Sequence, residues 1–333
     1  MLTLQAKFIT KQMKTKKVLK NTALWTVIIL VALTIGGGAF MVRYSLTNTY
    51  HPGYSLEAEL DSMAVRNPEI ASWLDSIRHD GSLRDTFITA PDGVRLHALY
   101  VNAPQPTHAT AFLLHGYTDD ATMMLNIGHA YNVDLGMNIF IPDFRAHGLS
   151  EGGDIVGMGW TDQPDLRQWL GVVRNLYTDS AAVVVHGVSM GGSSAINMAG
   201  DEPEEFSGMI RCYIDDCGFT SVWDEFNSEL DKQFGLPAFP LLYTASGLCK
   251  LCYGWSFGEA SSLDRVKTCR KPLLVIHGDA DTYVPTEMGQ RLYDAATCEK
   301  ELWITKGVTH AKSYANDPAE YSRRISQFIS KYL

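Results

Sequence analysis

The sequence places one serine in a setting that is typical of an enzymatic nucleophile. Residues 187–191 read Gly-Val-Ser-Met-Gly; they follow an apolar β-type run, Ala182–His186, and precede small residues typical of a helix. A serine on a tight turn between a strand and a helix is held in strained backbone angles, and flanking glycines leave room for that turn. Ser189 is therefore the candidate nucleophile, and the chemistry it indicates is acyl transfer.

A serine hydroxyl at neutral pH needs a general base, and the sequence offers ten histidines. His115, His186 and His277 each end a predicted strand beside a glycine, where a structural role is favoured, and His147 lies in a loop. His310 follows the last predicted strand by a short loop and precedes the final helix. This position is the carboxyl edge of a parallel sheet, where sites of such sheets form, so we predict His310 as the base.

The base needs a carboxylate that holds its imidazole in one tautomer. Asp279 and Asp281 both follow the predicted strand Leu273–His277. Position along the chain alone leaves both aspartates as candidates.

The elements that must position these residues alternate between strand and helix signals after residue 83. Several strands are apolar without alternation, which is typical of a parallel sheet buried on both faces, while Ala90–Gly93 predicts a hairpin at its start. The predicted strands are Thr86–Thr89, Val94–Val101, Thr110–Leu114, Asn138–Ile141, Ala182–His186, Met209–Ile214, Leu273–His277 and Glu301–Thr305. The predicted helices include Asp120–Val133, Asp165–Tyr177, Met190–Gly200, Pro285–Ala296 and Pro318–Tyr332.

Four motifs and a late histidine occur in an order that resembles the α/β-hydrolase superfamily. They are His-Gly-Tyr-Thr at 115–118, Asp-Phe-Arg-Ala-His-Gly-Leu-Ser at 143–150, the serine turn, residues 277–285, and His310. The resemblance covers residues 83–333 and points to the bacterial serine hydrolases that carry a cap before the acid-bearing strand. It implies an α/β fold with a mostly parallel eight-stranded sheet flanked by helices, and a helical cap insertion at about 218–263.

The same resemblance assigns roles to residues. It selects Asp281, which immediately precedes Thr-Tyr-Val-Pro, as the orienting acid, and it gives the chain order Ser189, Asp281, His310. The resemblance also implies that the backbone N–H groups of Tyr117 and Met190 are the oxyanion donors. The aromatic residues of the cap, Trp223 and Phe226 among them, are expected to contact substrate or else to form the cap's own core.

The function expected from these residues is hydrolysis of carboxylic esters through an acyl-enzyme, with a small-molecule ester or short peptide as substrate and no cofactor. The runner-up is a peptidase of the prolyl-oligopeptidase-like type, although residues 43–82 are too few for the propeller such enzymes usually carry. Thioester hydrolysis and acyl transfer need only another substrate or acceptor. The alternative outside enzymes is a membrane-tethered binding module, because a fold alone does not imply activity.

Composition separates the N-terminus from the rest of the chain. The 333 residues have a net charge of −9 and 46% hydrophobic content, which argues against a disordered chain and against nucleic acid as a partner. Residues 1–42 nevertheless hold six lysines and no acid, and residues 21–42 are uncharged. About 20 apolar residues span a bilayer core, so we predict a basic cytoplasmic tail at 1–20, a signal anchor at 21–42 and an extracytoplasmic domain.

A cleaved signal peptide is the alternative, with Ala23–Ile35 as its apolar region and the cut near the small residues 36–39. Residues 43–82 are predicted to form a stalk and an amphipathic helix, which begins at Asn67 and Pro68 and packs on the main domain. The six cysteines leave disulfides open. Cys249 and Cys252 lack the second motif that a zinc site needs, so no metal is expected, and the oligomeric state stays open.

Overall fold

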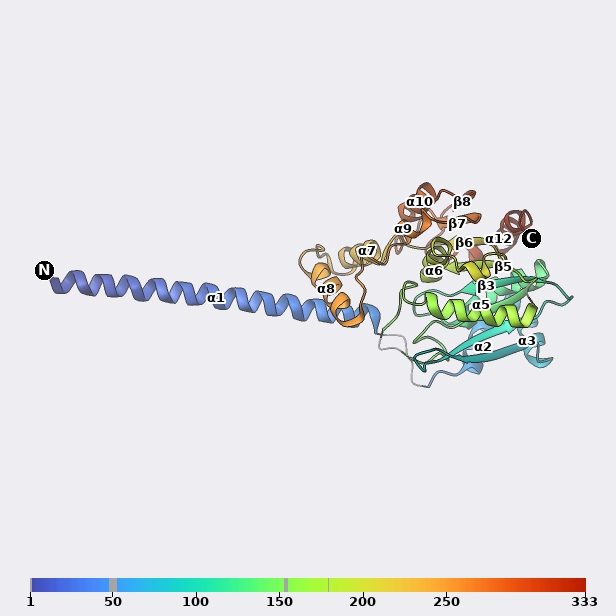
Figure 1. Ribbon diagram of the computed structural model, residues 1–333, viewed down its shortest axis with the longest axis horizontal. Helices are drawn as coiled ribbons and strands as arrows, with labels where there is room; N and C mark the ends of the chain where they lie inside the picture. Colours follow the sequence, from blue (N-terminus) through green and yellow to red (C-terminus); the bar gives the residue numbers. More distant parts are fainter. Residues whose placement is uncertain (1, 48–52, 153–154, 179) are drawn as a thin grey trace.

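The computed structural model describes residues 2–47, 53–152, 155–178 and 180–333. It has an α/β domain and one long N-terminal helix that projects from it (Figure 1). The α-helices are α1 (Leu2–Leu46), α2 (Leu56–Arg66), α3 (Ala71–His79), α4 (Leu125–His129), α5 (Gln163–Tyr177), α6 (Met190–Gly200), α7 (Val222–Phe234), α8 (Leu241–Tyr253), α9 (Ser262–Val266), α10 (Thr286–Ala295), α11 (Ser313–Asn316) and α12 (Pro318–Ile329).

The strands form a single eight-stranded sheet with the order β1-β2-β4-β3-β5-β6-β7-β8. Only β1, β2 and β4 meet in antiparallel pairs, and the remaining neighbours are parallel, which confirms the predicted mostly parallel sheet and its starting hairpin. Their bounds are β1 (Leu83–Thr89), β2 (Arg95–Val101), β3 (Ala109–Leu114), β4 (Asn138–Pro142), β5 (Ala182–Val188), β6 (Ile210–Asp216), β7 (Leu273–Gly278) and β8 (Lys300–Thr305).

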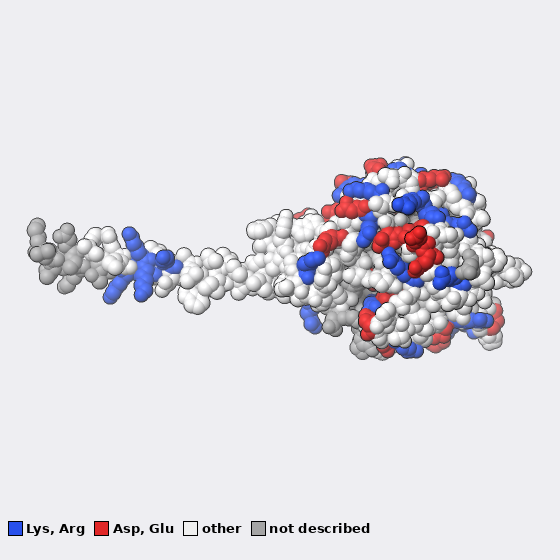
Figure 2. All heavy atoms as spheres, viewed as in Figure 1, with Lys and Arg blue, Asp and Glu red and all other residues white. Residues whose placement is uncertain are grey.

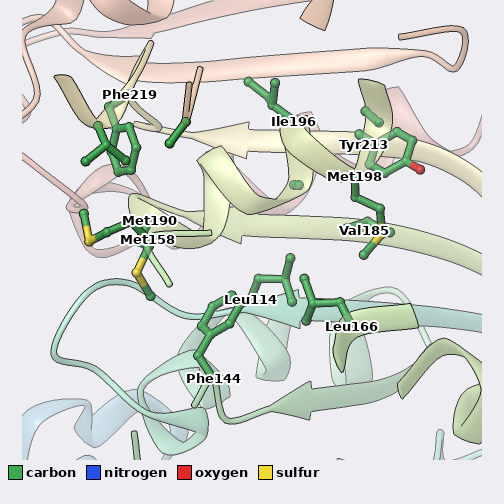
Figure 3. Close-up of a cluster of buried hydrophobic side chains, with 14 of the residues drawn as sticks. Leu114, Phe144, Met158, Leu166, Val185, Met190, Ile196, Met198, Tyr213 and Phe219 are labelled. Carbon is green, nitrogen blue, oxygen red and sulfur yellow. The ribbon is translucent and has the colours of Figure 1, made fainter. Parts of the chain in front are cut away.

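Each face of the sheet packs against its own set of helices. The core on one face joins the strands to α5, α6, α10, the cap and the end of α1. Figure 3 shows side chains from this cluster, among them Leu114 of β3, Val185 of β5, Tyr213 of β6 and Ile196 of α6. The other core joins the opposite face to α2, α3, α4 and α12. Inner strands such as β3, β5 and β7 are buried on both faces, as their unbroken apolar runs predicted.

The segment predicted as a stalk and amphipathic helix lies against the domain wherever the structure describes it. Ile70, Leu74 and Ile77 are buried against the sheet. Trp73 donates from its indole nitrogen to Asn132 Oδ1 at 3.3 Å. Residues 48–52 of the predicted stalk lie outside the described residues.

The predicted apolar span lies within α1, which continues four residues beyond Val42 to Leu46. Residues 11–46 are long and apolar enough to cross a membrane, with little of that stretch buried. The exception is the last turns of α1, where Gly38, Val42 and Leu46 are buried in the domain. In this view α7 and α8 form a projection beside that end of the helix (Figure 1).

Candidate active site

Ser189 is the single residue between strand β5 and helix α6. Strand β5 ends at Val188 and helix α6 begins at Met190, and Ser189 has φ 57° and ψ −117°. A Cβ on residue 187 would lie 1.9 Å from the carbonyl oxygen of Gly191, and one on residue 191 would lie 2.0 Å from that of Leu114. The turn therefore requires both glycines, and it holds Ser189 in the left-handed region, which is a strained conformation for a serine.

A chain of hydrogen bonds connects the three residues that the sequence analysis selected. His310 Nε2 lies 2.8 Å from Ser189 Oγ, and His310 Nδ1 lies 2.7 Å from Asp281 Oδ2. An ionised carboxylate only accepts hydrogen bonds, so Nδ1 carries the proton and Nε2 accepts from the serine hydroxyl. Ser189 and Asp281 are buried, and His310 between them is partly exposed.

Asp281 is held by several donors besides His310. Its Oδ1 accepts from the backbone N–H groups of Tyr283 and Val284 at 2.9 and 3.0 Å, and His277 Nε2 lies 3.3 Å from Oδ2. Burial alone would raise the pKa of Asp281, but the hydrogen bonds from His277 and His310 outweigh it and lower the pKa to about 2. Asp281 is therefore ionised near neutral pH.

Asp279, the other candidate acid, has a different partner. Its Oδ1 accepts from the backbone N–H of Gly307 at 2.6 Å. This bond connects the loop after β7 to the loop after β8. Asp279 thus orders the segment that carries His310 without contacting the imidazole.

The two residues predicted as oxyanion donors, Met190 and Tyr117, lie beside Ser189 in the structure. Met190 opens α6, and the first N–H groups of a helix have no acceptor within it. Gly116 is so close that a Cβ there would lie 3.6 Å from Ser189 Cβ, which places the following residue, Tyr117, beside the serine. The side chain of Tyr117 turns to α1, where its hydroxyl donates to the carbonyl of Ser45 at 3.0 Å.

A cavity of about 290 Å³ opens at Ser189 between the sheet, the cap and α1. One face of α7 lines it at helical spacing, with Phe226 and Leu230 on that face. Trp223, which was expected beside Phe226, lies outside this lining; its ring packs edge-on against Tyr243 of α8, with centroids 4.8 Å apart. Trp223 therefore packs within the cap, one turn before Phe226, because its ring turns toward α8 instead of the cavity.

The part of the cavity wall that α1 supplies was not predicted from the sequence. Gly37, Phe40, Met41 and Tyr44 of α1 line the cavity. Gly37, Phe40 and Met41 were assigned to the membrane span and Tyr44 to the stalk, and nothing local in the sequence distinguishes a residue facing lipid from one facing a cavity. The signal was the run of three glycines at 36–38, which is typical of a close helix–helix approach.

Glu225 of α7 is a buried acid on the cavity wall. Among the residues that the structure describes, neither of its carboxylate oxygens has a hydrogen-bond partner. Burial raises the pKa of Glu225 to about 8, and the nearby negative charge of Glu229 adds to this effect. Glu225 is therefore largely protonated near neutral pH.

The other histidines of the serine motifs form structural bonds. His115 Nε2 accepts from the backbone N–H of Phe144 at 3.0 Å, and His147 Nδ1 donates to the carbonyl of Arg145 at 2.8 Å. His186 lies between the hydroxyls of Tyr131 and Tyr321, both at 3.0 Å, and burial lowers the pKa of its imidazole to about 3. The bonds that these three histidines form lead away from Ser189.

Three side chains at this site are of types that can bind a metal ion. Cys217, Asp281 and His310 each offer an atom within 4.8 Å of the others. Asp281 and His310 are bonded to each other, and burial raises the pKa of the Cys217 thiol well above its ordinary value, while a metal ligand must be a thiolate. All six cysteines are free thiols in the structure.

Two families match by sequence profile. The family described as "Serine aminopeptidase, S33" matches residues 105–212, and the prolyl oligopeptidase family matches residues 161–333. Among curated proteins, the uncharacterised YqkD of Bacillus subtilis is 31% identical over 69% of this chain and 74% of its own length. The human "Alpha/beta hydrolase domain-containing protein 17B" is 21% identical over 80% of this chain and 81% of its own length.

Solved structures with the same fold include enzymes of two kinds. The esterase Pf2001 of Pyrococcus furiosus matches with a TM-score of 0.61 and 25% identity, over 75% of this chain and 91% of its own. The acylaminoacyl peptidase of Pyrococcus horikoshii matches with a TM-score of 0.56 and 18% identity, over 75% of this chain and 41% of its own. Both alignments leave out about a quarter of the chain described here.

Proposed function

This chain belongs to the prolyl oligopeptidase family and is a serine hydrolase of the α/β-hydrolase fold, and on that premise we propose that it cleaves carboxylic esters with Ser189, His310 and Asp281. The observation that carries the proposal is the continuous hydrogen-bond chain through His310, 2.8 Å to the serine and 2.7 Å to the aspartate. Such a chain is the arrangement in which a hydroxyl is activated by a base and the base by an acid.

In the proposed reaction Ser189 Oγ attacks the ester carbonyl while His310 Nε2 takes its proton. Asp281 stabilises the imidazolium that forms, and the N–H groups of Met190 and Tyr117 hold the oxyanion of the tetrahedral intermediate. His310 then protonates the leaving alcohol as the C–O bond breaks. Water, deprotonated by the same imidazole, releases the acid from the acyl-enzyme.

The preference for esters is supported by the cavity and by the solved esterase. Glu225 is largely protonated near neutral pH, and apart from Glu229 the other residues that the structure places on the cavity wall are uncharged and many are apolar. Phe226 is proposed to contact the acyl group there. A wall of this kind suits an acyl chain better than an extended polar peptide.

Peptide hydrolysis is the second candidate, and the two matching peptidase families favour it. The same serine, base and oxyanion donors would act on an amide, with an amine in place of the alcohol. Comparison of aminoacyl p-nitroanilides with p-nitrophenyl esters separates the two: cleavage of the anilides without the esters would make peptidase activity the function.

The direct test uses a fluorophosphonate probe and p-nitrophenyl esters of graded chain length on wild type and S189A. We expect the probe on Ser189 and a loss of ester turnover in S189A of at least about 10³-fold, since the residual rate then comes from the remaining binding and oxyanion groups. A wild-type protein that shows no labelling at Ser189, or an S189A variant that keeps full turnover, would contradict the proposal.

We also propose that α1 anchors the protein in a membrane with the hydrolase domain outside. The support is the lysine cluster before the apolar stretch and the burial of Val42 and Leu46 within the domain. A cut near residues 36–39 would remove glycines that contact α8, so retention of the whole helix is expected. Mass spectrometry of the mature N-terminus tests this: a start after residue 36 contradicts an anchor.

A further inference from the structure

The turn between α7 and α8 carries an apolar surface without charge. Residues 233–249 contain no Asp, Glu, Lys or Arg. Within this stretch Phe234, Leu236, Phe239 and Tyr243 are exposed, and Phe239 exposes 72% of its surface. Exposed aromatic and aliphatic side chains that gather on one projection are typical of a surface that binds another protein or a membrane.

This projection, residues 233–249, packs on the end of the apolar helix α1. A Cβ on Gly37 would lie 2.7 Å from Leu241 Cδ2, and one on Gly38 would lie 2.8 Å from Thr244 Cγ2 and 3.1 Å from the backbone nitrogen of Ala245. Helix α8 therefore approaches α1 at van der Waals contact of the backbones. Figure 1 shows the projection beside α1, on the side of the domain from which the helix leaves.

The position of the contact along α1 sets its depth in a bilayer. Gly38 precedes Arg43, the first charge after the apolar stretch, by five residues. At a rise of about 1.5 Å per residue this is roughly 8 Å along the helix. Interfacial helices bury their apolar faces about 5–10 Å below the headgroups, so with Arg43 at headgroup level the projection reaches the acyl chains. In Figure 2 the part of this region toward the free length of α1 is white, and the nearest blue and red side chains lie toward the domain.

The cavity at Ser189 extends to that depth. Gly37, Phe40 and Met41 line the cavity and also lie within the apolar span, and Leu241 lines it from α8. Phe40 is additionally exposed on the outer surface of the helix. The seam, by which we mean the contact of Gly37 and Gly38 of α1 with α8, thus borders the cavity at Ser189. At the depth inferred above it also lies at the level of the lipid acyl chains.

The charges on the cavity wall narrow the class of ligand. Among the described lining residues the acidic ones are Glu225, which is largely protonated near neutral pH, and Glu229, and there is no Lys or Arg. A phosphate-bearing headgroup would find no cation on this wall and would meet the negative charge of Glu229, whereas an uncharged glyceryl or alkyl ester meets no repulsion.

We propose that the projection inserts into the membrane surface and that the cavity takes the acyl chain of an uncharged ester lipid from the bilayer, through the seam with α1. This proposal rests on the esterase function proposed above and names its substrate class. The chemistry is hydrolysis: water is added across the acyl C–O bond, and the products are a fatty acid and an alcohol.

The test uses the full chain in phosphatidylcholine nanodiscs that contain 1-monooleoylglycerol, with p-nitrophenyl acetate as a soluble substrate in parallel. F239D places a charge on the projection outside the cavity lining. We expect it to lower oleate release at least about fivefold because an aspartate resists insertion among acyl chains, with acetate turnover within about twofold of wild type. The control is V65D, an equally drastic change at an 81%-exposed residue of α2, on the other face of the sheet, which should leave both rates unchanged.

Each outcome bears on one proposal. Oleate release by F239D at the wild-type rate, or acetate turnover without any release of oleate in wild type, overturns the lipid proposal and leaves the esterase intact. Preference for an anionic lysophosphatidylglycerol over monooleoylglycerol overturns the uncharged class. A wild-type chain without acetate turnover overturns the esterase function itself. Acetate turnover in F239D reports that the variant is folded.

Discussion

The hydroxyl of Tyr117 donates a hydrogen bond to the carbonyl of Ser45, 72 residues earlier in the chain, at 3.0 Å. Ser45 lies in the last turn of the apolar helix α1, and Tyr117 lies on the loop that carries a proposed oxyanion N–H. The bond therefore connects the helix proposed to anchor the protein directly to the loop beside the nucleophile.

Y117F removes this bond and leaves the backbone N–H of residue 117 in place. We expect a loss of about 1 kcal/mol in the free energy of unfolding, the usual net contribution of one such bond, and ester kcat within about twofold of wild type. Thermal melts in detergent and steady-state kinetics measure both. Y243F, which alters an exposed tyrosine of the cap, serves as the control. A fall in kcat as large as that of S189A would mean that the side chain itself takes part in the reaction.

D281N should separate the two candidate acids. Asparagine at 281 cannot stabilise the imidazolium, so we expect kcat for p-nitrophenyl esters to fall by about 10³–10⁴-fold. The matched variant D279N keeps the bonds of His310 and changes only the contact to Gly307, so kcat should stay within about tenfold of wild type. Equal losses in the two variants would contradict the assignment of Asp281.

Glu225 gives the protein a pH dependence of stability with a defined sign. Its folded-state pKa of about 8 lies above the ordinary value of 4.5, so the folded chain holds a proton that the unfolded chain has released between these values. The stabilisation is present below pH 4.5 and is lost as the pH rises through about 8. E225Q, which keeps the shape without the charge, should lose several degrees less in melting temperature between about pH 5 and about pH 9.

The control for that experiment is E229Q. Glu229 already accepts from Gln233 Nε2 at 2.7 Å and lies near Lys232, and its charge is a smaller cause of the raised pKa of Glu225 than burial is. E229Q should therefore keep most of the alkaline fall of the melting temperature. If E225Q falls as steeply as wild type, Glu225 is not the group that titrates.

Two glycines of α1, Gly36 and Gly38, offer matched positions for a test of how the cap helix α8 packs on α1. G38L would force a side chain into Thr244 and the backbone of Ala245, whereas no described atom lies within 4 Å of a Cβ on residue 36. Overpacking of this kind costs about 1–3 kcal/mol, so G38L should melt several degrees below wild type and G36L close to it. Similar melting temperatures for the two variants would show that α8 does not pack on Gly38.

The sequence predicted most of this architecture because the signals were local. Apolar runs bounded by turn residues indicated all eight strands to within three residues at each end, and the glycines around Ser189 indicated the strained turn. Asp281 needed the resemblance, since position alone did not separate it from Asp279. Once the strand order was known, the carboxyl edge of the sheet brought Ser189, Asp281 and His310 together.

What the sequence did not reveal depends on contacts between distant segments. The approach of His277 to Asp281 and the orientation of Trp223 into the cap follow from packing, which no local pattern encodes. The same holds for α1, where apolar residues of the predicted span also form a cavity wall. Hydropathy reports that such residues avoid water but not which apolar environment receives them.

The unbroken path of α1 from its lysines to Leu46 has a mechanical consequence. A transmembrane helix whose apolar stretch is longer than the hydrocarbon core can tilt to fit, so its tilt angle depends on bilayer thickness. Because the last turns of α1 are buried in the domain, any tilt of the proposed anchor would rotate the whole domain with it and change the angle between the cavity and the bilayer. Under the lipid-substrate proposal, membrane thickness would then affect access to the substrate.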